Sequence, residues 1–108
     1  MPKKKKTLER DFQKSFIKKV KTLFKGCIVL KNDSGYLQGI PDWIVLFKDK
    51  WALLEMKKSS KANKQPNQEY YVELADKMSF ARFVYPENSD SVIEELTNFF
   101  GAAGGGAE

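Results

Sequence analysis

The stretch that decides the fold runs from Gly39 to Lys57 and reads G-I-P-D-W-I-V-L-F-K-D-K-W-A-L-L-E-M-K. Two apolar runs, Trp43 to Phe47 and Trp51 to Leu54, flank a polar tip that contains an aspartate. Short β-rich runs around such a turn are typical of a β-hairpin. We expect a tip with an even number of residues, centred on Asp49 and Lys50.

This register predicts which side chains meet at the open end of the hairpin. It places Asp42 opposite Lys57, and because side chains alternate between the faces of a strand, it places Glu55 on the same face as both. A tip with an odd number of residues would break the alignment. Two carboxylates and an ammonium gathered there are costly to desolvate unless a function uses them.

The remaining hairpin residues are apolar on both faces. A hairpin of this kind belongs at the centre of a sheet that is covered by helices on each side. The charged trio is then expected at the polar corner of a buried sheet.

The trio has a chemical interpretation. Carboxylates on adjacent strands suit Mg²⁺ or Mn²⁺, which prefer oxygen ligands, and the backbone carbonyl of Met56 offers a third oxygen. A lysine beside them, Lys57, can orient or deprotonate an attacking water and stabilise charge on a phosphate. The alternative is a surface salt bridge at a strand end.

A longer pattern contains the same residues. G-I-P-D, then E-M-K, then Gln68 in Q-P-N-Q-E-Y-Y at the start of a helix resembles the PD-(D/E)XK nuclease superfamily, and within it the VRR-NUC branch, which includes small virus-encoded nucleases. The resemblance covers roughly residues 8–86. It departs from the usual pattern at Met56, where an aliphatic residue is common, and this is harmless if only the carbonyl is used.

The resemblance implies a restriction-endonuclease-like αβββαβ core, an α/β fold with a central mixed sheet and helices on both faces. It implies a metal-dependent DNA endonuclease that acts as a homodimer on branched DNA such as Holliday junctions, inside the cell (in the host cytoplasm if the protein is viral). The catalytic residues would be Asp42, Glu55, Lys57 and Gln68. The metal would be held by Asp42, Glu55, the Met56 carbonyl and Glu9. The alternatives are a catalytically inactive nucleic-acid-binding module and a basic subunit of a larger complex.

Composition limits the choice of function. The chain has 108 residues, enough for one domain, with a net charge of +5 that favours a polyanionic partner, either nucleic acid or an acidic membrane. The absence of histidine and the single cysteine exclude His-based zinc sites, histidine general bases and a disulfide framework. The apolar runs are too short to span a membrane, so we expect no membrane partner.

We divide the chain into a flexible basic arm (residues 1–6), a single nuclease domain (7–100) and a Gly/Ala-rich tail (101–108). A helix is expected from an N-cap at Thr7 to about Lys25. Its helical wheel places Glu9 on the apolar stripe and Asp11 on the solvent side. Glu9 then either joins the metal site or, frayed into water, complements the helix dipole.

Further elements follow in the order expected of the fold. We predict a strand over Cys27 to Lys31, a helix that begins at Pro66, a strand over Ser79 to Tyr85, and a last helix capped near Asn88. The expected core stripe of the helix after Pro66 comprises Tyr70, Tyr71, Leu74, Ala75 and Met78.

The remaining predictions concern partners. Candidate phosphate contacts are Lys3, Lys4, Lys5, Lys6, Ser34, Gly39, Lys58, Lys61 and Lys64. The alternative interpretation is that the lysines of residues 3–6 belong to a solubilising tail and those of residues 58–64 to a linker. Phe99 and Phe100 are nominated as part of a dimer interface, with packing into the monomer's own core as the alternative.

Overall fold

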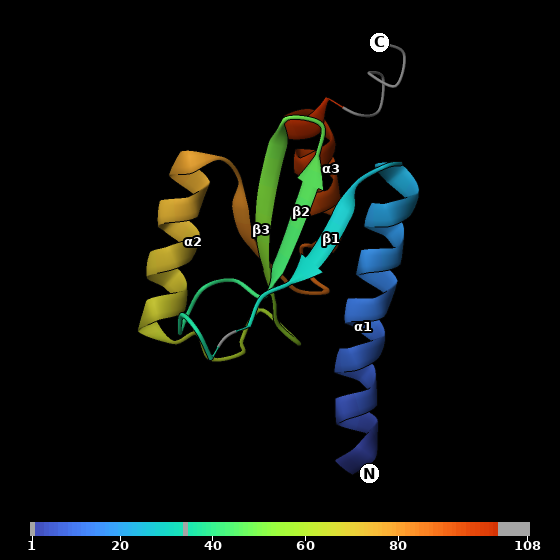
Figure 1. Cartoon of the computed structure of the whole chain (residues 1–108). Helices are drawn as coiled ribbons and strands as arrows, with labels where there is room; N and C mark the ends of the chain where they lie inside the picture. The colour runs from blue at the N-terminus through green and yellow to red at the C-terminus, as the bar shows by residue number, and fades with distance from the viewer. Residues whose placement is uncertain (1, 34, 102–108) are drawn as a thin grey trace.

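The computed structural model describes residues 2–33 and 35–101, and the side chains of residues 9–33 and 35–101. The described chain forms a four-stranded sheet between helices (Figure 1). The elements in chain order are α1 (Pro2–Leu23), β1 (Ile28–Lys31), β2 (Trp43–Phe47), β3 (Lys50–Met56), α2 (Pro66–Met78), β4 (Ala81–Val84) and α3 (Ser89–Phe100).

The sheet is mixed, with strand order β1-β2-β3-β4. The first three strands are antiparallel to their neighbours, whereas β4 runs parallel to β3 after the crossover through α2. This α/β arrangement confirms the predicted fold class and is compatible with an αβββαβ core. The predicted hairpin lies in the middle of the sheet, with β1 and β4 at its edges.

The hairpin turns one residue earlier than expected. Phe47 pairs with Lys50, so the two-residue tip is Lys48-Asp49 and not Asp49-Lys50. Lys48 has a φ of 57°, in the left-handed region that tight hairpin turns require. The tip still has an even number of residues, so each side chain keeps its predicted face while its cross-strand partner changes.

Helices cover both faces of the sheet, as predicted (Figure 1). On one face, α1 and α3 bury the larger core, in which Val20 and Leu96 pack with hairpin residues such as Val45 and Leu54. On the other face, α2 buries a smaller core around Leu53. Because α2 contacts β3 and β4, the outer part of this face over β1 stays exposed, as at Ile28.

The predicted core stripe of α2 is confirmed at Ala75 but is wrong at its two ends. Val72 and Ala75 are the buried residues of this helix, whereas Tyr70 and Met78 are 59% and 66% exposed. The helix packs on only two strands, so its buried stripe is narrower than the run of apolar residues in its sequence suggests.

The first helix begins at Pro2, so the prediction of an N-cap at Thr7 after a flexible arm is wrong. Proline is favoured in the first turn of a helix, and lysine is a good helix former, so the lysine run continues the helix. Met1 and residues 102–108 of the predicted tail lie outside the described residues.

The last helix seals the core. Phe100 is 4% exposed and makes edge-to-face contacts with Phe24 and Phe47, at ring-centroid distances of 5.1 and 5.4 Å. Phe99 packs against the same core. The alternative, packing into the monomer's own core, is therefore confirmed for Phe100, whereas Phe99 packs on that core and is only half-buried.

None of the helices in the described ranges combines the length and the apolar character needed to cross a membrane.

Candidate active site

The two hairpin carboxylates lie side by side at the open end of the hairpin. Trp43 pairs with Leu54, so Asp42 and Glu55 form the next pair beyond the ladder, on the face that α2 covers. The Asp42 backbone N–H donates to Glu55 Oε1 at 3.1 Å. The expected partner of Asp42 was Lys57, and the earlier turn replaces it with Glu55, while all three residues remain on one face.

The loop that precedes β2 fixes the position of Asp42. The Asn32 N–H donates to the Asp42 carbonyl oxygen at 2.6 Å, and the Asn32 side chain donates to the Pro41 carbonyl oxygen at 2.7 Å. Pro41 itself is fully buried. The Pro-Asp step is therefore held between the end of β1 and the core.

Lys57 and Gln68, both predicted site residues, lie within hydrogen-bonding distance of each other and near Glu55. Lys57 Nζ donates to Gln68 Oε1 at 2.8 Å and lies 3.9 Å from Glu55 Oε2. Gln68 Nε2 donates to the same Glu55 oxygen at 3.2 Å. Gln68 Oε1 also accepts the Gln65 N–H at the start of α2, so the helix positions this side chain.

Burial changes the acidity of the site. Glu55 is the one buried charged residue of the described chain, with 5% of its surface exposed. Loss of hydration and then the nearby Asp42 carboxylate raise its pKa from 4.5 to about 7. Lys57, the Asp42 N–H and Lys31 act in the opposite direction and offset part of the rise.

Oxygen atoms at this corner fit a hard divalent cation. The Asp42 carboxylate accepts no hydrogen bond from a described residue, and Glu55 Oε1 lies next to it on the Asp42 backbone N–H, while Glu55 Oε2 faces Gln68 and Lys57. The Leu53 N–H donates to the carbonyl oxygen of Phe80, just before β4, and the Lys57 N–H donates to that of Val84 in β4. Because backbone groups alternate in direction along a strand, the Met56 carbonyl points to the other side, toward Asp42. Carboxylate and carbonyl oxygens are the ligands that Mg²⁺ and Mn²⁺ prefer.

Glu9 does not join this cluster. Within residues 2–33 and 35–101, no three histidine, cysteine, aspartate or glutamate side chains are grouped so that they could hold a metal ion. The helical wheel oriented the side chains correctly, since Glu9 is half-buried and Asp11 is exposed. However, α1 packs on the face of the sheet opposite to Asp42 and Glu55.

Gly39 is explained by packing. It has a φ of +94°, and a Cβ there would meet the Asn67 backbone carbon at 3.0 Å in the first turn of α2. The absence of a side chain lets the loop approach α2, so a phosphate is not needed to explain this glycine.

The predicted phosphate contacts are differently placed. Lys58 and Lys61 are exposed in the loop after β3, whereas Lys64 lies over the rings of Phe83 and Tyr85 at 5.0 and 5.6 Å. Ser34 lies outside the described residues, as do the side chains of Lys3, Lys4, Lys5 and Lys6.

Two residues of the site escaped prediction. Asn32 holds the Pro-Asp step, and Lys31 places a positive charge close enough to affect Glu55. The signal for both was their position at the end of a strand expected beside the hairpin.

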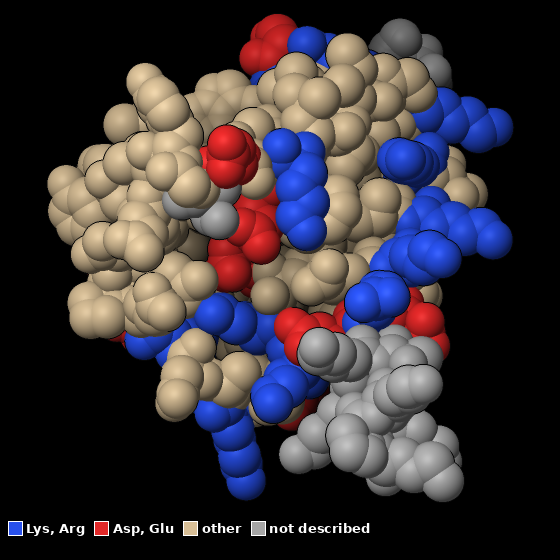
Figure 2. All heavy atoms as spheres, turned by 60° about the horizontal axis from the view of Figure 1, so that its bottom comes forward, with Lys and Arg blue, Asp and Glu red and all other residues tan. Residues whose placement is uncertain are grey.

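Figure 2, which turns the lower end of Figure 1 forward, shows acidic side chains partly sunk in the middle of this face with lysine and arginine side chains around them.

The fold and the site together define an α/β domain with paired carboxylates, a lysine and a glutamine at one end of its sheet. No family model, no curated protein and no solved structure matches this chain. The assignment of a function therefore depends on the chemistry of these side chains.

Proposed function

We propose that the protein is a metal-dependent nuclease of the PD-(D/E)XK type that hydrolyses phosphodiester bonds in DNA. The observation that carries the proposal is the pairing of Asp42 with Glu55 beside Lys57 and Gln68, in one hydrogen-bonded network at the sheet end. A network of buried and half-buried charges is costly for a small domain to maintain without a use.

Each residue has a role in this chemistry. Asp42, Glu55 and the Met56 carbonyl would hold Mg²⁺ or Mn²⁺, which supplies Lewis acidity at a phosphate oxygen. Lys57 would orient the attacking water and stabilise the negative charge that develops on the phosphate. Gln68 holds the Lys57 ammonium at 2.8 Å and so fixes its direction.

The resemblance to the VRR-NUC branch extends the proposal to the substrate. It favours branched DNA such as a Holliday junction and a homodimer, because two cuts on opposing strands need two sites and a two-fold dimer supplies them. Light scattering, with cleavage of four-way, flapped and linear DNA, tests this part separately. A monomer that cuts linear duplex as well as junctions contradicts it without affecting the site.

The central test is cleavage of this DNA panel with Mg²⁺, Mn²⁺ or EDTA. We expect cutting with either metal and none in EDTA, and we expect Asp42→Asn, Glu55→Gln and Lys57→Ala each to lower the rate by at least about 100-fold. Matched controls are Asp49→Asn at the exposed hairpin tip and Lys77→Ala at the far end of α2. Equal losses in the controls, or full activity in EDTA, would refute the proposal.

A nucleic-acid-binding module without catalysis is the second candidate. It is favoured by the observation that no third acidic side chain joins Asp42 and Glu55 within the described parts of the chain. This candidate predicts DNA binding that is insensitive to EDTA, with no cleavage under either metal. The same panel therefore separates the two functions.

A further inference from the structure

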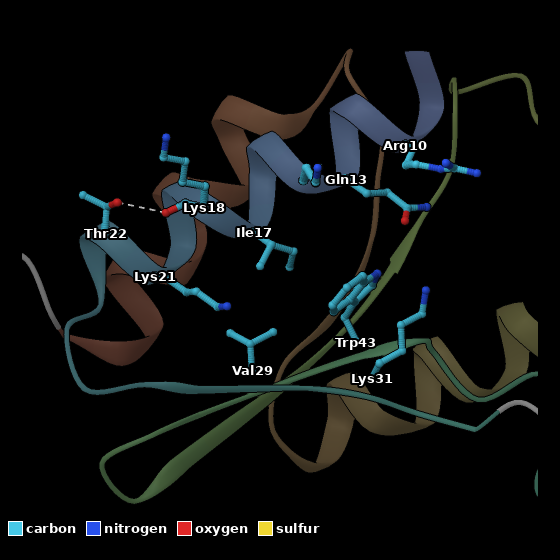
Figure 3. Close-up of a pocket in the computed structure, with 10 residues that line it drawn as sticks. Arg10, Gln13, Ile17, Lys18, Lys21, Thr22, Val29, Lys31 and Trp43 are labelled. Atoms are coloured by element: carbon cyan, nitrogen blue, oxygen red, sulfur yellow. Dashed lines mark hydrogen bonds between the residues drawn. The ribbon is translucent and has the colours of Figure 1, made fainter. Parts of the chain in front are cut away.

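A groove of about 610 Å³ runs between α1 and the edge strand β1 (Figure 3). Its floor is formed by β1 and the start of β2, and one wall is formed by α1. Its lining includes the cations Arg10, Lys14, Lys18, Lys21 and Lys31, together with Trp43. Their register places the groove on the face of the sheet opposite to Asp42 and Glu55.

The groove is strongly positive. Half of its lining residues are lysine or arginine, with no aspartate or glutamate among them. None of the five cations has an acidic partner within 4.0 Å in the described part of the chain, whereas Lys19 on the same helix pairs with Asp90. These cations are exposed, so they remain free to bind an anion.

The cations are spaced along one line. Arg10, Lys14, Lys18 and Lys21 follow one side of α1, over a rise of about 16 Å at 1.5 Å per residue. One strand of nucleic acid presents a phosphate about every 3.4 Å of its axis, so this line can face roughly five phosphates. A row of this length fits a backbone better than it fits a single phosphate group.

One end of the groove meets the candidate active site. Trp43 pairs with Lys31, whose ammonium lies 4.7 Å from the indole centroid. The next residues along the two strands are Asp42 and Asn32, which are hydrogen-bonded to each other. The Trp43 Nε1 atom is buried without a hydrogen-bond acceptor among the described residues, and Figure 3 shows it directed toward Gln13 and Arg10.

We propose that this groove binds the sugar-phosphate backbone of one nucleic-acid strand and leads it to the site at the end of the sheet. The inference rests on the proposed function for the direction of the strand, but the binding itself needs no cleavage. Nucleic acid is favoured over a membrane because the cations line a recessed channel whose end residues, Lys31 and Trp43, adjoin Asn32 and Asp42 along the two strands, whereas a lipid surface needs a flat or protruding basic face.

Binding of labelled 20-nucleotide DNA and RNA strands in EDTA tests the groove, by anisotropy at several salt concentrations. We expect Lys14→Gln/Lys18→Gln to weaken binding roughly 20-fold at 0.1 M salt and to lower the salt slope by about 1.4, since each lost contact contributes about 0.7 on a single strand. The control Lys19→Gln/Lys25→Gln removes the same charge from outside the groove lining and should change binding at most about twofold.

Trp43 provides a second readout, because the chain has two tryptophans and Trp51 packs on the other face. In Trp51→Phe, adding DNA should change the remaining Trp43 fluorescence, and adding Lys14→Gln/Lys18→Gln should weaken that response.

Equal losses of nucleic-acid affinity in both double variants, or Trp43 fluorescence that does not change when DNA is added, would overturn the groove proposal. The cleavage results would be unaffected. If Lys14→Gln/Lys18→Gln loses binding to phosphatidylserine vesicles while its nucleic-acid binding is unchanged, the groove proposal is overturned in favour of a membrane surface. Nucleic-acid binding that depends on the groove, without any cleavage, would refute the proposed nuclease function and leave the groove proposal intact. A preference for the DNA or the RNA strand identifies which backbone it takes.

Discussion

The proton on Glu55 should make the stability of the protein depend on pH between 5 and 8. Glu55 is 5% exposed, and its pKa is raised from 4.5 to about 7, first by loss of hydration and then by Asp42. The folded state therefore binds this proton more tightly than the unfolded chain. The stabilisation is complete below pH 4.5 and is lost as the pH rises through 7.

The size of the effect follows from the two pKa values. At about 1.4 kcal/mol per pH unit, the difference between 4.5 and about 7 corresponds to about 3 kcal/mol, most of it lost between pH 5 and pH 8. For a domain of this size, about 3 kcal/mol is a large fraction of the total stability. No histidine is present to titrate in the same range, so the carboxyl can be observed with little interference.

The assay is urea unfolding of the wild type and Glu55→Gln at pH 5, 6, 7 and 8. Glutamine keeps the shape but leaves its amide facing Gln68, which costs about 1 kcal/mol for one lost hydrogen bond at every pH. The diagnostic quantity is therefore the change with pH. From pH 5 to pH 8 the free energy of unfolding of the variant should rise by about 2.5 kcal/mol relative to that of the wild type, whereas Asp49→Asn should follow the wild type. Parallel curves for Glu55→Gln and the wild type would refute the assigned protonation.

Other predictions concern the metal, the loop and the core. Mn²⁺ affinity measured by calorimetry should fall about tenfold per pH unit below pH 7, because the metal must displace the Glu55 proton, and should level off above it; a flat profile would contradict the assigned ligand. Gly39→Ala should destabilise the protein by at least about 2 kcal/mol more than Gly26→Ala in urea unfolding, since both glycines have positive φ but a Cβ clashes only at Gly39. Phe100→Ala should cost about 3 to 5 kcal/mol and Tyr70→Ala about 0.5 kcal/mol or less in the same assay; similar costs would show that the last helix does not seal the core.

The hairpin shows why much of the site was predictable. The face of a strand on which a side chain lies depends only on whether the turn has an even or odd number of residues. The tip moved by one residue, from Asp49-Lys50 to Lys48-Asp49, and every cross-strand partner moved by two, so no side chain changed face. The grouping of Asp42 with Glu55 therefore survived an error in the turn that changed the partner of each.

Helices are harder to place, because a helical wheel describes one helix and not its position on the sheet. The wheel of α1 correctly separated Glu9 from Asp11, but a sheet that is apolar on both faces can receive a helix on either. The connection into β1 places α1 opposite the carboxylates. This placement removes Glu9 from the metal cluster and also brings the basic side of α1 over β1, where Lys31 lines the groove.

The regular spacing of Arg10, Lys14, Lys18 and Lys21 was visible in the sequence, but a row of cations on a helix is usually only a solvated face. The row of cations becomes a candidate binding surface here because the β-strand β1 lies across from it and ends next to the candidate active site.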